Sequence, residues 1–217
     1  MRLILVRHGE TEHNRGQLTL GRADVPLNER GLAQARAVAA SFATPPDAVY
    51  SSPLVRARET ASRIAQGAGL EVRIDDGLIE MDVGEMEHLT GAELRERYPE
   101  FLRHWLSGEA AADARMPGGE TLAEVQERAW AAVQRMRAAH PDETVVAVSH
   151  NFVILALVCR ALELPLGRFR RIRQSLAART ILDVGEESAS LLQLNDLAHL
   201  AAAGLADDLL GGGARRP

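Results

Sequence analysis

The chain has 217 residues, of which 46% are hydrophobic and 25% charged, and its formal net charge is -5. This size and composition suit one folded domain over residues 1–217 and leave little room for a second one. The chain lacks the basic stripe of a nucleic-acid-binding protein, and it has neither a signal peptide nor an apolar run long enough to span a membrane. We therefore expect a cytoplasmic protein with no nucleic-acid or membrane partner.

The amino-terminal half alternates between strand and helix patterns. Residues 3–6 form a continuous apolar run, which is typical of a strand buried on both faces. Asn28 can cap a helix that ends before the prolines at 45 and 46. The other elements expected in this half are a strand over 48–50, a helix from about Pro53 with proline in its first turn, and a strand over 71–74.

Capping boxes mark the two helices expected next. They are Thr90 with Glu93, before a short helix that ends near Pro99, and Thr121 with Glu124, before a long helix that stops at Pro141. The remaining elements are a strand over 144–148, an apolar helix after His150, strands over 179–184 and 188–194, a helix from Asn195, and a flexible tail over about 205–217.

This alternation predicts a three-layer α/β sandwich, with a mostly parallel central sheet and helices on both faces. Ligands bind such sheets at the carboxyl ends of the strands. Two histidines stand at such strand ends, His8 after the first strand and His150 after the strand over 144–148. The single cysteine, Cys159, lies in an apolar run, so we expect a buried structural thiol and neither a disulfide nor a cysteine-based zinc site.

Arg7, His8 and Gly9 follow the first strand at a place where backbone can approach an anion closely. This segment resembles the histidine phosphatase superfamily, also called phosphoglycerate mutase-like, in the branch that begins Arg-His-Gly-Glu-Thr. The segments that carry the resemblance are 7–11 with Asn14, 26–31, 51–61, 78–80, 117–121 and 148–150. The resemblance implies a phosphoglycerate mutase-like fold and an enzyme that hydrolyses a small phosphomonoester.

The resemblance also implies a role for each catalytic residue that matches. His8 is the residue that becomes phosphorylated, and Glu80 is similar to the family's proton donor. Arg7 and Arg56 hold the phosphoryl oxygens, and His150 completes the pocket. These residue types suit the chemistry, because the charge that spreads over three phosphoryl oxygens is stabilised by fixed cationic donors.

Asn14 and Asn151 are two further candidates for binding the phosphate. Asn14 matches a family position that lines the phosphate pocket, and Asn151 follows His150 at a helix start, where free N–H groups favour anions. Asn151 stands where relatives usually have Gly or Ala, and Met86 and His88 replace their Trp and Gly. These differences bear on substrate identity more than on reaction type, and His88 is a candidate for substrate contact.

Proton transfer sets two requirements on the site. His8 must be neutral to attack, so the neighbouring arginines should lower its pKa by like-charge repulsion. Glu80 must be partly protonated near neutrality, which requires burial or a nearby carboxylate. The same carboxylate can then activate water, so the scheme needs no metal and no cofactor.

Two alternatives to a phosphatase remain open at this point. A cofactor-dependent phosphoglycerate mutase would pass the phosphoryl group to a phosphorylated sugar acid, and a non-catalytic relative would only bind a phosphorylated ligand. Among phosphatase substrates, phosphosugars, phosphoglycerates, phosphoserine, nucleotides and the phosphorylated nucleoside of cobalamin synthesis all stay possible. A homodimer with twofold symmetry is expected on base rates alone.

Overall fold

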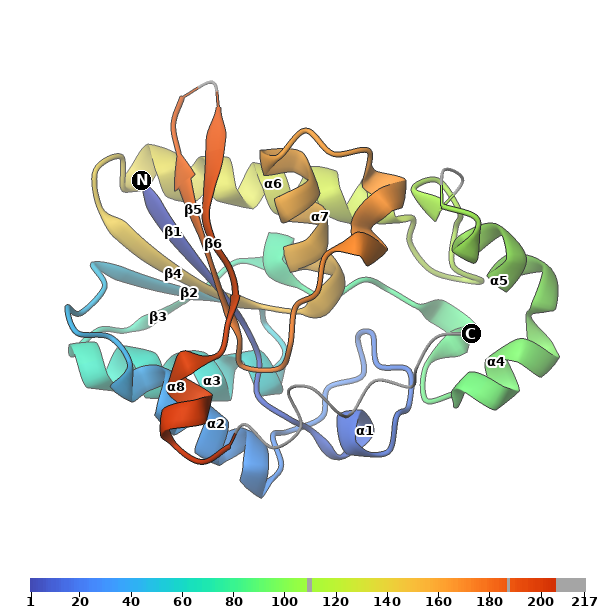
Figure 1. Cartoon of the computed structure of the whole chain (residues 1–217), viewed down its shortest axis with the longest axis horizontal. Coiled ribbons are helices and arrows are strands. Elements are labelled where there is room, and N and C mark those ends of the chain that lie inside the picture. The colour runs from blue at the N-terminus through green and yellow to red at the C-terminus, as the bar shows by residue number, and fades with distance from the viewer. Residues whose placement is uncertain (109–110, 187, 206–217) are drawn as a thin grey trace.

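The computed structural model describes residues 1–108, 111–186 and 188–205 of the chain (Figure 1). The tail that we predicted to be flexible lies, from residue 206 on, outside the described residues. In the described part, six strands form one sheet in the order β3-β2-β4-β1-β5-β6. The strands are β1 (Arg2–Arg7), β2 (Ala48–Ser51), β3 (Val72–Ile74), β4 (Thr144–Ser149), β5 (Arg179–Val184) and β6 (Ala189–Asp196).

The sheet is mostly parallel, as the alternating pattern predicted. β1 pairs in parallel with β4, and β2 pairs in parallel with both β3 and β4. β5 pairs antiparallel with β1 on one side and with β6 on the other, so that β6 is the edge strand. The carboxyl ends of β1 and β4 therefore lie side by side, with Arg7 opposite Ser149.

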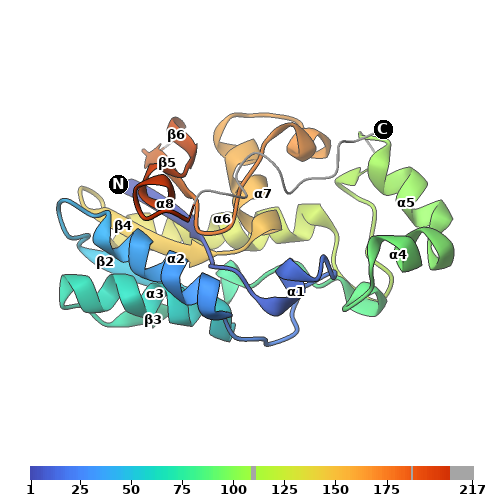
Figure 2. The same ribbon diagram turned by 60° about the horizontal axis from the view of Figure 1, so that its bottom comes forward.

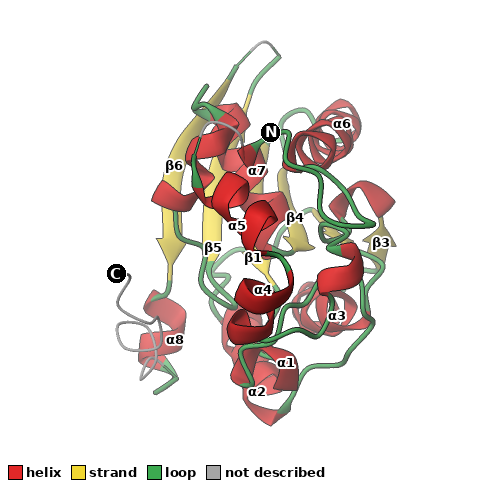
Figure 3. Cartoon of the chain, turned by 90° about the vertical axis from the view of Figure 1, so that its right-hand side faces the viewer, coloured by secondary structure: helices red, strands yellow, loops and turns green. Residues whose placement is uncertain are grey.

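Helices cover both faces of the sheet (Figures 2 and 3). The α-helices are α1 (Glu12–Arg15), α2 (Glu29–Ala40), α3 (Val55–Ala68), α4 (Gly91–Arg97), α5 (Pro99–Leu106), α6 (Leu122–Ala139), α7 (Asn151–Ala161) and α8 (Ala198–Ala202). Short 3₁₀ helices are η1 (Asp76–Leu78), η2 (Gly84–Met86) and η4 (Leu166–Arg171). α4 and α5 extend beyond the sheet on one side (Figure 1).

The central strand β1 buries both of its faces, in two separate cores. In β1, Leu3 and Leu5 pack in the core that contains α6 and α7. Ile4 and Val6 point the other way, into the core that contains α2 and α3. This follows from the two-residue period of a strand, and it explains why residues 3–6 are apolar throughout. The three-layer α/β sandwich is confirmed.

The helix start predicted at about Pro53 lies two residues from the observed one, and the start predicted at Asn195 is wrong. The helix expected from Pro53 begins at Val55, whose backbone N–H donates to Asp24 Oδ1 at 2.6 Å. The helix expected from Asn195 begins at Ala198, because Asn195 and Asp196 still belong to β6. In both cases a contact with a residue distant in sequence decides the boundary.

Helices whose caps are local begin where the sequence predicted. Asn28 caps α2, and the capping boxes at Thr90 and Thr121 begin α4 and α6. α5 was not predicted as a separate helix, and it begins at Pro99 directly after α4. Among the residues that the structure describes, no helix is both long and apolar enough to cross a membrane.

Candidate active site

His8 lies directly beyond β1, buried, with 3% of its surface exposed. Its backbone N–H donates to the carbonyl of Ser149 at 3.0 Å, which ties the loop after β1 to the end of β4. Its Nδ1 lies 2.7 Å from the carbonyl oxygen of Gly9. Because a carbonyl can only accept, Nδ1 carries the proton and Nε2 keeps the lone pair that a nucleophile requires.

The loop that carries His8 packs against the first turn of α2 without room for side chains. A Cβ on Gly9 would lie 2.5 Å from the carbonyl oxygen of Gly31, and a Cβ on Gly31 would lie 2.1 Å from that of Glu10. The N–H of Gly9 donates to Thr60 Oγ1 in α3 at 3.2 Å. Two glycines thus allow the backbone contact that positions His8.

His150 brings a second imidazole to the same place. Its ring centroid lies 5.1 Å from that of His8, and the residue is fully buried. Its Nε2 shares a hydrogen bond of 2.7 Å with Ser52 Oγ, from the segment after β2. In the described part of the chain, its Nδ1 is buried without a hydrogen-bond partner.

Arg7 and Arg56 are anchored to backbone carbonyls. Arg7 donates to the carbonyl of Gln174 at 2.6 Å, and Arg56 donates to those of Gly21 and Ala23 at 2.6 and 2.7 Å. Each guanidinium also has a buried Nε with no hydrogen-bond partner among the described residues. Buried polar groups are normally paired, so these nitrogens are candidate donors to a bound anion.

Glu80 is buried beside the two arginines and is held at both carboxylate oxygens. Oε1 accepts from the N–H of Met81 at 2.8 Å, and Oε2 accepts from that of Phe152 in α7 at 3.5 Å. Its backbone is fixed separately, because Arg128 of α6 donates to the Glu80 carbonyl at 3.1 Å. The carboxyl group therefore has a defined place next to the two guanidinium groups.

The pKa shifts of His8 and Glu80 both go in the direction that proton transfer requires. Burial, and then repulsion from Arg56 and Arg7, hold the pKa of His8 well below its usual value. Burial raises the pKa of Glu80, against the hydrogen bond from Met81 and the attraction of the arginines. Burial lowers the pKa of Arg7 to about 10, which leaves it charged near neutrality.

The two predicted asparagines have different surroundings. Asn151 is the first residue of α7, and its Oδ1 accepts a hydrogen bond of 3.3 Å from Arg7. Asn14 lies in α1, where its Oδ1 accepts from the N–H and the hydroxyl of Thr11 in a capping box. Asn151 is thus in contact with the predicted phosphate-binding group, whereas the contacts of Asn14 stabilise the loop after His8.

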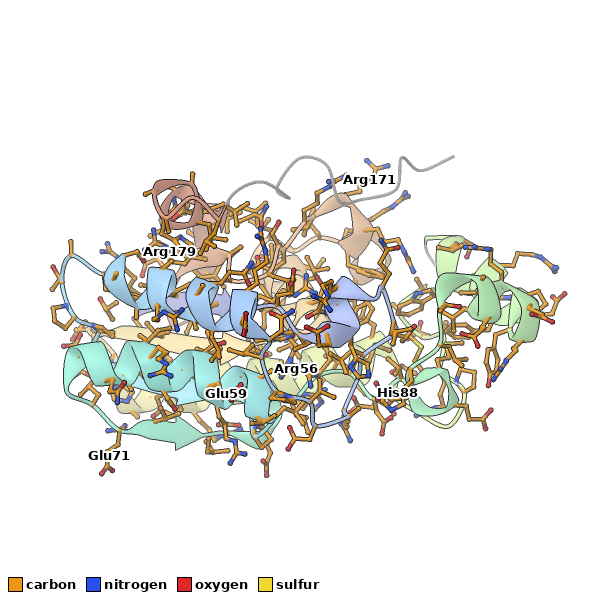
Figure 4. All side chains as sticks on the ribbon, turned by 90° about the horizontal axis from the view of Figure 1, so that it is seen from below. Arg56, Glu59, Glu71, His88, Arg171 and Arg179 are labelled. Carbon is orange, nitrogen blue, oxygen red and sulfur yellow. The ribbon has the colours of Figure 1, made fainter. Side chains whose placement is uncertain are left out.

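The positions that differ from the family pattern lie in separate environments. Met86 is 3% exposed and belongs to the hydrophobic core. His88 has a φ of 66°, unusual for histidine, and its Nδ1 lies 2.9 Å from Nε2 of His13. In Figure 4, His88 appears between Arg56 and the helices α4 and α5. Its contact with a substrate stays a prediction.

Several residues that support the site were not predicted. Ser52 contacts His150, Thr60 contacts the loop after β1, and the Gln174 carbonyl holds Arg7. Ser52 stands in the segment 51–61 that carries the resemblance, so its place was visible in the sequence. Gln174 lies between η4 and β5, where no periodic pattern marks it.

Two further observations concern possible metal ligands and the single cysteine. Within residues 1–108, 111–186 and 188–205, no group of three or more His, Cys, Asp or Glu side chains could hold a metal ion. Cys159 is fully buried, and burial raises the pKa of its thiol to about 11. This agrees with the structural thiol that we predicted.

Comparisons with known proteins agree with this geometry. The model of the histidine phosphatase superfamily, branch 1, matches residues 3–197. Phosphoserine phosphatase 1 of Hydrogenobacter thermophilus is 36% identical over 201 residues, which cover 92% of this chain and 94% of that protein.

Solved structures are similar over nearly the same length. YhfR of Bacillus stearothermophilus has a TM-score of 0.86 at 29% identity and covers 92% of this chain and 98% of its own. A mycobacterial glucosyl-3-phosphoglycerate phosphatase, in a complex with VO3, has a TM-score of 0.81 at 32% identity, with 89% and 98% covered.

Proposed function

Because the chain belongs to the histidine phosphatase superfamily, we propose that it hydrolyses a small phosphomonoester through a phosphohistidine formed on His8. One observation carries this proposal. Buried nitrogens of Arg7, Arg56 and His150, none with a hydrogen-bond partner in the described part of the chain, accompany a neutral imidazole whose Nε2 is free. These groups can bind a phosphoryl group and attack its phosphorus.

In the first step, Nε2 of His8 attacks the phosphorus and the bond to the ester oxygen breaks. Arg7 and Arg56 balance the charge on the phosphoryl oxygens, at no cost of reorganisation because backbone carbonyls already hold them. Glu80 gives its proton to the departing oxygen, which leaves as an alcohol.

In the second step, water replaces the histidine. The Glu80 carboxylate takes a proton from water as the water oxygen attacks phosphorus, and the bond between phosphorus and Nε2 breaks. Inorganic phosphate leaves, His8 is neutral again and Glu80 is protonated again. Each group returns to the state favoured by the direction of its pKa shift.

A phosphatase is favoured over a mutase, because the similar proteins described above include a phosphoserine phosphatase and a glucosyl-3-phosphoglycerate phosphatase. We propose a small phosphorylated metabolite as substrate, with Asn14 and Asn151 near the phosphate. The cytoplasmic location, the single domain over 1–217 and the homodimer stay predictions.

The test is release of inorganic phosphate from a panel of small phosphomonoesters, with EDTA present, by the wild type and by His8→Ala. We expect the variant to lose turnover by more than about 10³-fold, because the nucleophile is gone. His104→Ala, at an exposed position of α5, is the control and should keep full activity.

Two outcomes would contradict the proposal. Retention of most activity by His8→Ala would show that another group is the nucleophile. Isomerisation of 3-phosphoglycerate in the presence of its bisphosphate, without net release of phosphate, would favour the mutase.

A further inference from the structure

Residues 174–178, between η4 and β5, contact the backbone or side chain of both Arg7 and His8, and we call this segment the bracket. The Gln174 carbonyl accepts from the Arg7 guanidinium at 2.6 Å. The Ala177 N–H donates to the His8 carbonyl at 3.1 Å, and the Ala178 carbonyl accepts from the Arg7 N–H at 3.2 Å. The bracket therefore sets the position of the nucleophile and of one phosphate-binding group together.

Two side chains near the end of the described chain hold the bracket in turn. Asn195, in β6, accepts a hydrogen bond of 2.7 Å from the Ser175 N–H through its Oδ1. His199, in α8, lies 3.0 Å from the Ala177 carbonyl oxygen through its Nε2. Because that oxygen can only accept, Nε2 carries the proton of the His199 ring.

The surroundings of His199 show that this contact is specific. The residue is 8% exposed, and its Nδ1 is buried without a hydrogen-bond partner among the described residues. Among the described residues, the His199 ring therefore makes one hydrogen bond, and that bond goes to the bracket. A histidine placed only to fill space would not need its one donor directed at Ala177.

The bracket also has a conformation that requires support. Ala177 has a φ of 55°, in the left-handed region that residues other than glycine seldom adopt. Both of its polar backbone groups are engaged, the N–H with His8 and the carbonyl with His199. Without the contact to His199, the left-handed conformation of Ala177 loses one of its two supports, and the N–H that bonds to His8 is held less firmly.

We propose that Asn195 and His199 are positioning residues for the hydrolysis, acting on His8 and Arg7 through the bracket. This inference rests on the proposed function. Neither residue touches the reacting groups in this arrangement, so each acts by placing other residues. Misplacement of a catalytic group by about 1 Å can lower a rate by roughly 10²-fold.

The test at His199 compares two substitutions. His199→Phe keeps a ring but removes the donor, whereas His199→Gln can place an amide donor near the position of Nε2. With p-nitrophenyl phosphate as substrate, we expect kcat to fall by about 10- to 100-fold in the first variant. The second should recover most of the loss, because it restores the hydrogen bond.

His140→Phe is the matched control for loss of stability. His140 is similarly buried, and its ring contacts Tyr50, Arg73 and Glu143 before β4, away from the bracket. It should lower the melting temperature while leaving kcat near the wild-type value. A kcat that falls equally in His140→Phe and His199→Phe would overturn the proposal, since the effect would be general.

Asn195 offers a second and independent test if His199→Phe does not fold. Asn195 has a φ of 51°, so Asn195→Gly keeps the backbone but removes the acceptor. Asn195→Asp keeps an acceptor oxygen in a residue that tolerates this conformation. We expect kcat to fall in the glycine variant and to recover in the aspartate variant, and equal activity in both would overturn the role of Asn195.

Binding of inorganic phosphate separates this inference from the proposed function. If the wild type releases no phosphate from any ester, the proposed function fails, but Arg7 should still bind phosphate. Calorimetry should then show weaker phosphate binding by His199→Phe than by wild type or His199→Gln. Equal affinities in the three proteins would overturn the inference.

Discussion

The proposed reaction needs a pair of protonation states, at His8 and Glu80, that ordinary pKa values seldom allow at the same pH. The reaction requires neutral His8 and protonated Glu80, whereas the unperturbed pKa values are 6.5 for His and 4.5 for Glu. With those values, at most about 1% of molecules would have the required pair of states at any pH. Burial lowers the first pKa and raises the second, so both shifts increase this fraction.

We therefore predict a bell-shaped dependence of kcat/KM on pH whose acidic limb lies below pH 6.5. Protonation of His8 sets this limb, and its pKa in the free protein is lowered. Loss of the Glu80 proton sets the basic limb, which lies above pH 4.5 because that pKa is raised. Steady-state rates with an alkyl phosphate, whose leaving group needs a proton, would measure both limbs.

Glu80→Gln provides the control for this prediction. It should remove the basic limb and slow alkyl phosphates by about 10²- to 10⁴-fold, while p-nitrophenyl phosphate, with its good leaving group, should be slowed much less. An acidic limb at or above pH 6.5 would contradict the prediction, because it would mean that the pKa of His8 is not lowered in the free protein.

The residues of the candidate site could be brought together from the sequence because their spacing along the chain forms a motif. His8 and His150 each follow an apolar strand, and the structure brings their rings together. Gln174 could not be predicted, because it acts through its backbone carbonyl, which every residue has. The sequence carries no signal for such a contact.

At the scale of elements, the first turn of α2 determines where the loop after β1 lies. Gly31 in this turn meets the backbone of Glu10 so closely that an added Cβ would lie 2.1 Å from its oxygen. We predict that Gly31→Ala lowers the free energy of unfolding by about 1–3 kcal/mol and also lowers kcat, because the displaced loop carries His8. Chemical unfolding and steady-state kinetics would measure the two effects.

Gly67→Ala is the matched control in a second helix. Gly67 lies in α3, and an added Cβ would have no atom of the described residues within 4 Å besides the nearby backbone of its own helix and its chain neighbours. Alanine should therefore stabilise the protein by roughly 0.5–1 kcal/mol and leave kcat unchanged. If Gly31→Ala proved as harmless as Gly67→Ala, the contact between α2 and the loop would not position the nucleophile.

Element boundaries were predictable where the cap is local in sequence. Thr121 caps α6 together with Glu124, three residues on, and that start was predicted. α3 receives its cap from Asp24, 31 residues before Val55, so a start at Pro53 looked equally good in sequence. A capping contact between separate segments exists only once the fold has formed.

At the scale of the molecule, the alternation of strands and helices was sufficient to predict the layers, but not how the end of the chain supports the site. β1 and β4 carry the two histidines to one edge of the sheet, as expected for parallel neighbours. β6 and α8 then supply Asn195 and His199, which hold the bracket. Antiparallel pairing of β5 with β1 brings this late segment back to the site.

The site also affects the stability of the whole molecule, because its histidines are buried in the neutral form. Burial is the largest cause of the lowered pKa of His8, His150 and His199. In the unfolded chain these groups take up protons near pH 6.5, whereas in the folded protein they do so only at lower pH. Their contribution is therefore complete above pH 6.5 and is lost as pH falls below it.

We predict that the free energy of unfolding falls by up to about 4 kcal/mol between pH 7.5 and pH 5.5, since each such histidine can contribute up to about 1.4 kcal/mol per pH unit below 6.5. Glu80 opposes this loss, because its raised pKa lets the folded protein keep a proton that the unfolded chain releases above pH 4.5. Three histidines outweigh one carboxyl group. Urea unfolding at both pH values would measure the difference, and His199→Gln, with one histidine fewer, should show a smaller one. In Glu80→Gln, which lacks the opposing carboxyl group, a free energy of unfolding that did not change over this range would mean that the buried imidazoles take up protons in the folded protein as readily as in the unfolded chain.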